Sequence, residues 1–172
     1  KMYEPLTKEP YNVPLLSANR RSAEMIKYAS NDFLALKISY INEIANLCEK
    51  LGANIEDVSK GMGFDSRIGK KFLNAGIGYG GSCFPKDTKA LYHLSSMVES
   101  DLLTVKACID VNEKQKIKLY NNLVDDLGDL NGKVIAVLGL TFKPGTDDLR
   151  EAPSLYNIEL LLKAGAIVKA YD

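Results

Sequence analysis

One stretch decides how this chain is organised: Gly76-Ile77-Gly78-Tyr79-Gly80-Gly81-Ser82-Cys83-Phe84-Pro85-Lys86-Asp87. Its glycines tolerate positive φ angles and let backbone N–H groups come close to a ligand. Pro85 suits the first position of a helix, so we expect a helix to begin here and run to about Ser96. Cys83 would then lie at the positive end of the helix dipole, which, together with Lys86, favours the nucleophilic thiolate. An isolated cysteine in such a turn is more often an inert, half-buried side chain.

Composition limits the possible functions. The chain has 172 residues and 46% hydrophobic content, enough for one medium domain or slightly more. Lys+Arg and Asp+Glu both count 22, so no net charge attracts nucleic acid or an anionic membrane. The cysteines at 48, 83 and 108 form neither a disulfide framework nor a paired metal motif, and there is one histidine. We expect no metal site, no membrane span and a reducing, cytoplasmic location.

A single long helix is expected from Ser22 to Leu51, because no proline or glycine interrupts this segment. Ser22 can cap its start and Gly52 can close it. Residues 1–21, which contain three prolines, indicate an extended lead-in.

The apolar residues of this helix cover more than one face. One face comprises Ile26, Phe33, Tyr40, Ile44 and Leu47, and another Leu34, Ile38, Ile41, Ala45 and Cys48. A helix with this pattern is usually central, buried by neighbouring helices or by a second subunit. Toward the N-terminus the second face continues to Asn31 and Lys27. Spacing alone favours a position at the solvent-exposed end of this face over one facing a polar pocket.

The remaining segments predict further helices and then a change of class. A short helix is expected within 53–75, before a basic loop, and another helix from Leu102 to about Leu127. Cys48 and Cys108 fall in apolar patterns and indicate packing, and we interpret His93 as structural. The fold class is therefore mixed: an all-α domain over 22–128, followed by an α/β unit over 132–172.

The α/β unit is predicted from the order strand, helix, strand. The strands are "KVIAVLGL" and "AIVKAYD", and the helix between them opens at Pro153 and Ser154 and closes at Gly165. A right-handed β-α-β crossover with strands buried on both faces is expected. Two strands do not make a stable sheet, so we expect the domain to continue beyond Asp172. After the first strand only Gly139 matches the dinucleotide fingerprint, which by itself favours a different nucleotide or none.

Three segments carry a resemblance. These are "GIGYGGSCFPKDTKAL" from 76, "IKYASNDFLALKISYINE" from 26 and "GLTFKPGTDDLREAPS" from 139. Together they resemble the UDP-glucose/GDP-mannose dehydrogenase family, and most closely its UDP-glucose 6-dehydrogenase branch. The resemblance implies a helical dimerisation domain, a homodimer through the long helix, and the start of a Rossmann-like UDP-sugar-binding domain. The chain contains no counterpart of the family's N-terminal dinucleotide-binding domain.

The resemblance also implies roles for single residues. Cys83 corresponds to the catalytic cysteine, Lys27 and Asn31 flank it, and Asp87 assists proton transfer, although a first-turn carboxylate favoured by the helix dipole is its simpler role. Arg67 would reach the sugar nucleotide of the partner subunit. The other substrate contacts implied are Phe72, Leu73, Asn74, Gly80, Phe142 and Lys143, and the NAD contacts are Lys86 and Arg150.

The implied reaction is the NAD-dependent, two-step oxidation of UDP-glucose to UDP-glucuronate through a cysteine thiohemiacetal and thioester. Alternatives within the family are GDP-mannose 6-dehydrogenase and other nucleotide-sugar dehydrogenases. From a different class, the chain could be a helical dimerisation module without enzymatic activity, because its long helix has more than one apolar face.

Overall fold

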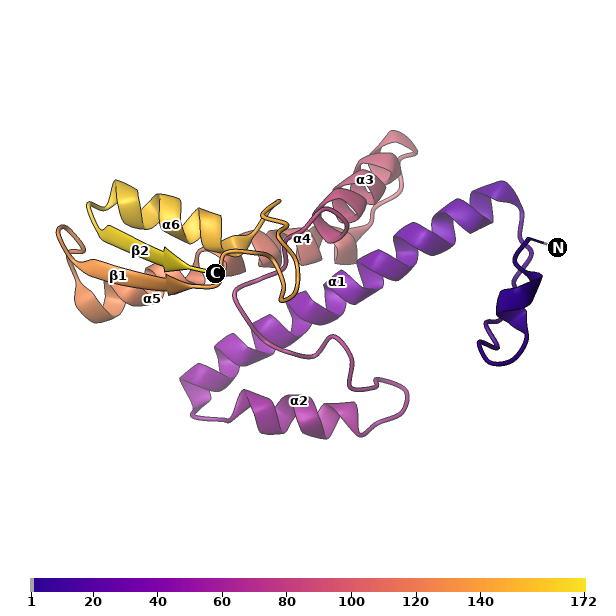
Figure 1. The fold of residues 1–172 in the computed structure, drawn as a ribbon, viewed down its shortest axis with the longest axis horizontal. Coiled ribbons are helices and arrows are strands. Elements are labelled where there is room, and N and C mark those ends of the chain that lie inside the picture. The colour runs from indigo at the N-terminus through magenta and orange to yellow at the C-terminus, as the bar shows by residue number, and fades with distance from the viewer. Residues whose placement is uncertain (1) are drawn as a thin grey trace.

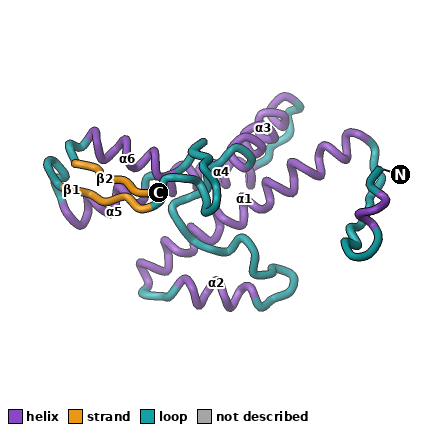
Figure 2. Tube along the Cα trace, in the orientation of Figure 1, coloured by secondary structure: helices purple, strands orange, loops and turns teal. Residues whose placement is uncertain are grey.

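The computed structural model describes residues 2–172. It is mostly helical, with one small parallel sheet. The elements are a 3₁₀ turn at Glu4–Thr7, α1 (Arg20–Leu51), α2 (Ile55–Gly63), α3 (Phe84–Met97), α4 (Leu103–Lys116), α5 (Lys118–Leu127), β1 (Val134–Leu138), α6 (Pro153–Lys163) and β2 (Ile167–Tyr171). Figure 1 shows α1 as the long diagonal element, with α2, α3 and α4 along it and the strands gathered with α5 and α6 at one end. The loop that leads into α3 and the loop that follows β1 come together near α4 (Figure 2).

Helix α1 begins two residues earlier than the sequence indicated. Its cap is Asn19, whose side chain accepts the backbone N–H of Ser22, so the assignment of Ser22 as the cap is wrong. Asn19 takes this role because it keeps an extended backbone (φ −67°, ψ 161°) from which its amide oxygen reaches the free N–H groups of the first turn. Gly52 closes the helix with φ 69°, as expected. The lead-in is not wholly extended, since it contains the 3₁₀ turn.

The two apolar faces of α1 have different environments. Ile41, Ala45 and Cys48 of the second face are buried against the other helices. The first face carries Ile26, Phe33, Tyr40 and Leu47 at a spacing of seven residues, and these side chains remain between 48% and 62% exposed. The helix therefore presents a row of apolar side chains that the other residues of 2–172 leave about half exposed.

The single helix expected from Leu102 to Leu127 is in fact two helices, α4 and α5, which meet at Ile117 (φ −99°, ψ 2°). The cause lies on α6. Asn157 Nδ2 donates to the carbonyl oxygen of Lys116 (2.6 Å), and Asn157 Oδ1 accepts the N–H of Tyr120 (2.9 Å). One side chain thus supplies partners for backbone groups on both sides of the break, which removes the cost of interrupting the helix.

The strands β1 and β2 pair in parallel, from Val134 opposite Ile167 to Leu138 opposite Tyr171, as the β-α-β pattern predicts. Ile135 and Val137 point into a core formed around Leu130, Leu161 and Ala166, with Tyr120 and Leu123 of α5 packed against it. The expectation that β1 is buried on both faces is wrong for the described residues. Val134 and Leu138 are exposed on the other face, because α5 and α6 both pack on the inner side.

Candidate active site

Cys83 occupies the N-cap position of α3, makes no capping hydrogen bond with its side chain, and is exposed as a free thiol. This position agrees with the expected start of a helix after the glycine-rich stretch. The Cys83 sulfur lies 3.8 Å from the Ser82 hydroxyl. Phe84 is the first helical residue, so Pro85 occupies the second position rather than the first. The Phe84 ring packs edge-on against Tyr79, with ring centroids 5.8 Å apart, and this contact fixes the segment that carries Cys83.

The glycine-rich segment before Cys83, residues 76–81, is held by side-chain amides. Asn112 Oδ1 accepts the Tyr79 N–H (2.8 Å), and Asn112 Nδ2 donates to the Tyr79 carbonyl (3.0 Å). At the start of the segment, the Gly76 N–H donates to Asn42 Oδ1 (2.8 Å), and Gln115 Nε2 donates to the Gly76 carbonyl (2.6 Å). Helices α1 and α4 therefore pair the backbone groups of a loop that has no secondary structure of its own.

Lys27, Asn31 and Asp87 converge between α1 and α3. Asp87 is completely buried, and its Oδ2 accepts hydrogen bonds from Asn31 Nδ2 (2.6 Å) and from the Lys27 ammonium. Asp87 lies one turn after Cys83, and its own N–H donates to the Cys83 carbonyl (2.8 Å). The other oxygen, Oδ1, has no hydrogen-bond partner, although the Lys86 ammonium lies 3.7 Å away.

Charges in this cluster reinforce one another. Burial acts to raise the pKa of Asp87, but the hydrogen bonds from Lys27 and Asn31, with the charges of Lys27 and Lys86, outweigh it and hold the pKa below its ordinary value. The pKa of Lys27 is raised by its hydrogen bond to Asp87, with smaller contributions from the charges of Asp87, Tyr28 and Cys83. At neutral pH the site therefore contains a carboxylate and an ammonium, and Cys83 is within electrostatic range of that ammonium.

A second segment, residues 142–151, lies directly on the glycine-rich segment. The Gly81 N–H donates to the carbonyl of Arg150 (2.7 Å). A Cβ at Gly81 would lie 2.8 Å from the Phe142 ring, and a Cβ at Gly80 would overlap the carbonyl oxygen of Glu151. These glycines are required because only a hydrogen on Cα leaves room for the approach. Phe142 and the backbone of Arg150 and Glu151 thus lie next to the segment that carries Cys83.

The other residues expected at the site lie in different environments. The Arg150 guanidinium donates to Asp148 through Nε (2.9 Å) and Nη2 (2.7 Å), which lowers the pKa of Asp148 to about 2. The Lys143 ammonium lies 5.2 Å from the centre of the Phe142 ring and is exposed. Arg67 binds Asp65 on its own loop (2.6 Å) and is exposed.

The segment between Arg67 and the glycines is divided between surface and interior. Leu73 is buried, so its side chain packs inside the protein, whereas Asn74 is exposed. Phe72 has φ 64° and packs edge-on against Phe84, with ring centroids 6.1 Å apart. One chain therefore brings together Lys27, Asn31, Asp87, Gly80, Phe142 and the helix start at Cys83, while Arg67 makes its contacts elsewhere.

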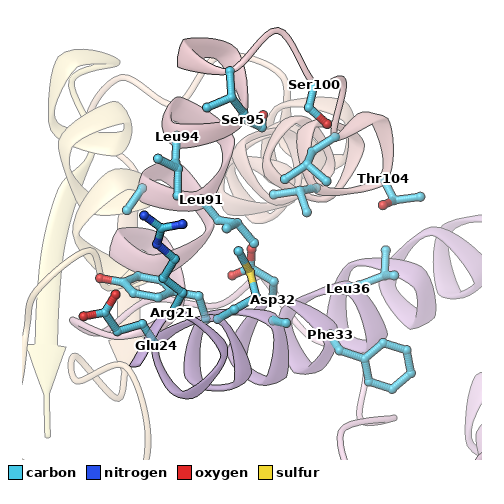
Figure 3. Close-up of a pocket in the computed structure, with 17 residues that line it drawn as sticks. Arg21, Glu24, Asp32, Phe33, Leu36, Leu91, Leu94, Ser95, Ser100 and Thr104 are labelled. Atoms are coloured by element: carbon cyan, nitrogen blue, oxygen red, sulfur yellow. The ribbon is translucent and has the colours of Figure 1, made fainter. Parts of the chain in front are cut away.

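Sequence reasoning missed Asp32. A groove of about 1120 Å³ lies between α1, α3 and the beginning of α4, and Asp32 lies in its wall among apolar residues that include Leu36, Leu91 and Leu94 (Figure 3). Asp32 is only 6% exposed, and neither carboxylate oxygen has a hydrogen-bond partner. The available signal was spacing, because Asp32 shares steps of three and four residues with Ala35, Ser39 and Asn42, all of them buried.

Burial raises the pKa of Asp32 to about 6, and the charge of Asp87 adds to the effect while Lys27 opposes it. A carboxyl group with a raised pKa in the folded state is penalised when it ionises. It therefore lowers stability progressively as the pH rises from its ordinary value of 3.8 through about 6.

Comparison with known proteins places the chain in a family. The model of the UDP-glucose/GDP-mannose dehydrogenase family central domain matches residues 21–114, and the model of the same family's UDP binding domain matches residues 136–172. The chain belongs to the UDP-glucose/GDP-mannose dehydrogenase family.

Similar proteins agree with this placement. UDP-glucose 6-dehydrogenase YwqF from Bacillus subtilis is 56% identical over 163 residues, which is 95% of this chain and 37% of that protein. UDP-glucose 6-dehydrogenase from Rhizobium meliloti is 51% identical over 160 residues, covering 92% of this chain and 37% of that protein. The chain thus spans little more than a third of the length of these curated relatives.

Solved structures give the same result. The structure of a UDP-glucose dehydrogenase from Pyrobaculum islandicum superposes with a TM-score of 0.92 at 41% identity, covering 98% of this chain and 39% of that one. A GDP-mannose dehydrogenase from Pseudomonas aeruginosa superposes with a TM-score of 0.55 at 31% identity, covering 99% of this chain and 38% of that one.

Two kinds of feature are absent from residues 2–172. None of the helices there has the length and hydropathy needed to cross a membrane. Nor do three or more His, Cys, Asp or Glu side chains of this part of the chain gather as a metal site.

Gly80→Ala should destabilise the protein by about 1–3 kcal/mol, because the new methyl group would force Glu151 away from the glycine-rich segment. Gly61→Ala is the matched control: it lies inside α2 with nothing within 4 Å of the added atom, and should stabilise by up to about 1 kcal/mol. Urea unfolding of both variants measures the difference. Equal effects from the two substitutions would contradict the close packing at Gly80.

Asp32→Asn should raise the free energy of unfolding at pH 8 by about 2–3 kcal/mol, since it removes the penalty of a buried charge. Near pH 4 the gain should disappear, because Asp32 is then protonated. Denaturant unfolding across this pH range tests the effect, with exposed Asp125→Asn on α5 as the control. Loss of stability at pH 8 would mean that the Asp32 charge has a favourable partner.

Proposed function

We propose that this chain forms the nucleophile-bearing part of an NAD-dependent UDP-glucose 6-dehydrogenase, which oxidises UDP-glucose to UDP-glucuronate in two steps. The observation that carries the proposal is the exposed Cys83 at the N-terminus of α3, one turn from a carboxylate that binds both Lys27 and Asn31. Thiolate chemistry at a helix N-terminus and an ammonium within electrostatic range suit covalent capture of an aldehyde.

Cys83 would act on the aldehyde formed by the first oxidation. Its sulfur adds to the aldehyde carbon, the carbonyl oxygen takes up a proton, and a thiohemiacetal forms. Loss of hydride from that carbon to the oxidised cofactor, with loss of the hydroxyl proton, gives a thioester. Water then cleaves the carbon–sulfur bond, which releases the acid and restores the thiol. The covalent bond keeps the aldehyde from leaving between the two oxidations.

Three residues, Lys27, Asn31 and Asp87, would stabilise the oxyanions and help to position and deprotonate the attacking water. The raised pKa of Lys27 keeps its ammonium charged, so it can stabilise an alkoxide or tetrahedral oxyanion near Cys83. The lowered pKa of Asp87 keeps it ionised. Because its carboxylate is completely buried, it would assist proton transfer through the Lys27 ammonium that it binds rather than by touching the water itself. Asn31 fixes the carboxylate through the 2.6 Å hydrogen bond.

NAD, when bound, would accept the hydride in both oxidations. The residues of this chain could form one side of an NAD-binding site. Lys86 and Arg150 are exposed cations, and each carries charge suited to anionic phosphate groups. The chain offers only Gly139 of the glycine fingerprint after β1, so the fit does not extend to a complete dinucleotide pocket.

UDP-glucose is favoured over GDP-mannose as substrate by the comparisons. The structural likeness to the UDP-glucose dehydrogenase (TM-score 0.92) exceeds that to the GDP-mannose dehydrogenase (0.55) at similar coverage of this chain. From segment 142–151, Phe142 and Lys143 would contact the nucleotide sugar. The nucleotide sugar would also be bordered by Gly80, Phe72 and Asn74. Assaying the full-length enzyme with both nucleotide sugars separates the two substrates.

We also propose a cytoplasmic homodimer built on residues 22–128, with 132–172 as the start of a Rossmann-like UDP-sugar-binding domain. The row of Ile26, Phe33, Tyr40 and Leu47 on α1 is exposed and apolar, which is typical of a helix face covered by a second subunit. Arg67 adjoins this row in a shallow pocket with Phe33 and Tyr40, a position from which it could act on the partner's substrate. A dimerisation module alone would need no reactive cysteine, and thiol titration of Cys83 distinguishes that alternative.

Cys83→Ser in the full-length enzyme should abolish formation of the acid, because the hydroxyl of serine cannot replace the thiolate in the covalent step. Cys48→Ser should keep turnover, since Cys48 is buried in the core away from the site. Product analysis by chromatography measures both. Wild-type rates from the Cys83 variant would remove the covalent step from the proposal.

Leu47→Glu should weaken self-association of the chain by at least about tenfold, because a charge would be buried in the proposed dimer face. Leu47→Met keeps an apolar side chain at the same position and should leave association unchanged within about threefold. Sedimentation equilibrium determines the two dissociation constants. A dimer unaffected by Leu47→Glu would place the interface elsewhere.

A further inference from the structure

A buried lysine lies outside the cluster around Asp87. Lys116, the last residue of α4, is completely buried, and its ammonium lies among two carboxylates and an aromatic ring. It lies 3.0 Å from Glu113 Oε1 and 2.9 Å from Glu151 Oε2, and 4.5 Å from the centre of the Tyr156 ring. Burial acts to lower its pKa, but the hydrogen bonds to Glu151 and Glu113 outweigh this effect and raise it.

Glu151 joins this lysine to the candidate active site. Its Oε2 accepts hydrogen bonds from Lys116 and from Tyr156 Oη (2.7 Å), while its backbone carbonyl rests against Gly80. Its backbone has φ 53°, a conformation that costs a residue with a side chain about 1 kcal/mol or more. The surroundings therefore impose this geometry, since Glu151 would not adopt it alone.

Lys116 also touches the glycine-rich segment directly. A Cβ at Gly78 would lie 3.5 Å from Lys116 Cγ, so the lysine stem packs against the backbone there. The carbonyl of Lys116 accepts the hydrogen bond from Asn157 on α6. One residue thus contacts α6, segment 142–151 and the glycine-rich segment, which come from three separate regions of the sequence.

Stability alone does not account for such a cluster. Burying an ammonium costs several kcal/mol, and a buried ion pair is often no more stabilising than apolar residues of the same volume. What an ion pair provides is a defined distance and direction between its partners, because displacement leaves a charge buried without a partner. The carboxylate of Glu151 that is so fixed is joined through its short side chain to the backbone carbonyl that lies on Gly80.

We propose that the Lys116–Glu151 ion pair is a positioning device that holds segment 142–151, with Phe142, at a set distance from Cys83. The proposal rests on the proposed function, since Phe142 is the expected nucleotide-sugar contact. Lys116 itself touches no reacting atom. It acts by fixing where the sugar nucleotide lies relative to the sulfur that attacks its aldehyde.

The test is made in the full-length enzyme with Lys116→Met, Lys116→Arg, Glu151→Gln and the double variant Lys116→Met/Glu151→Gln. Backbone amide hydrogen exchange of residues 140–152 should be at least about tenfold faster in Lys116→Met, with exchange in α1 and α3 unchanged. The kcat/KM for UDP-glucose should fall at least about tenfold in the same variant. Lys116→Arg, which retains the charge, should restore most of both properties.

The double variant separates positioning by this pair from a general loss of packing. If the pair acts as a unit, the double variant should lose no more kcat/KM than Lys116→Met alone, whereas independent effects would multiply. Unchanged exchange of 140–152 in Lys116→Met, or multiplied losses in the double variant, would overturn the proposal. If Lys116→Met does not fold, Glu151→Gln gives the same exchange readout, because Glu151 is half-buried and the change keeps its shape.

The exchange experiment also keeps the two proposals apart. Absence of UDP-glucose oxidation by the wild-type enzyme would overturn the proposed function. Faster exchange of 140–152 in the variants would then still support a device that positions this segment on the glycine-rich segment.

Discussion

The structure depends on pairing the backbone of a loop that has no ladder or helix of its own. Residues 76–81 approach the interior, where each unpaired N–H or C=O would be costly. Asn42, Asn112 and Gln115 provide the partners from two helices, and Asn112 makes both bonds to Tyr79. These amides lie on helices α1 and α4, which hold the loop in one conformation. The loop leads directly into the start of α3, where Cys83 lies.

The site is assembled by close approach of backbones as much as by side chains. Gly80 and Gly81 accept segment 142–151 because they lack Cβ atoms, so a loop next to β1 can lie on a loop of the helical region. Charges then fix the side chains: Asp87 gathers Lys27 and Asn31, and Glu151 gathers Lys116 and Tyr156. In each cluster a carboxylate is the centre, completely buried in Asp87 and half-buried in Glu151. Donors from different elements point to it, which ties together regions far apart in the sequence.

Local patterns were sufficient for most of the fold, whereas the grouping of Lys27 and Asn31 with Asp87 was expected from the family resemblance and not from spacing. The uninterrupted run after residue 21 gave the extent of α1 nearly correctly, and the alternation of strand and helix after Gly132 gave the parallel pair. The break at Ile117 could not be read locally, because its cause is the side chain of Asn157, forty residues later. Asp32 was missed for a similar reason: an acid is expected at the surface, and only the packing of α3 and α4 around α1 buries it.

The outer side of the small sheet has a consequence for work with this chain in solution. Leu138 and Tyr171 are 80% and 76% exposed, and two strands leave two rows of free backbone donors and acceptors. Such edges recruit further strands, including those of other molecules. Preparations of these 172 residues should therefore be prone to intermolecular β-aggregation at high concentration, and added charge at the ends of the strands is the natural remedy.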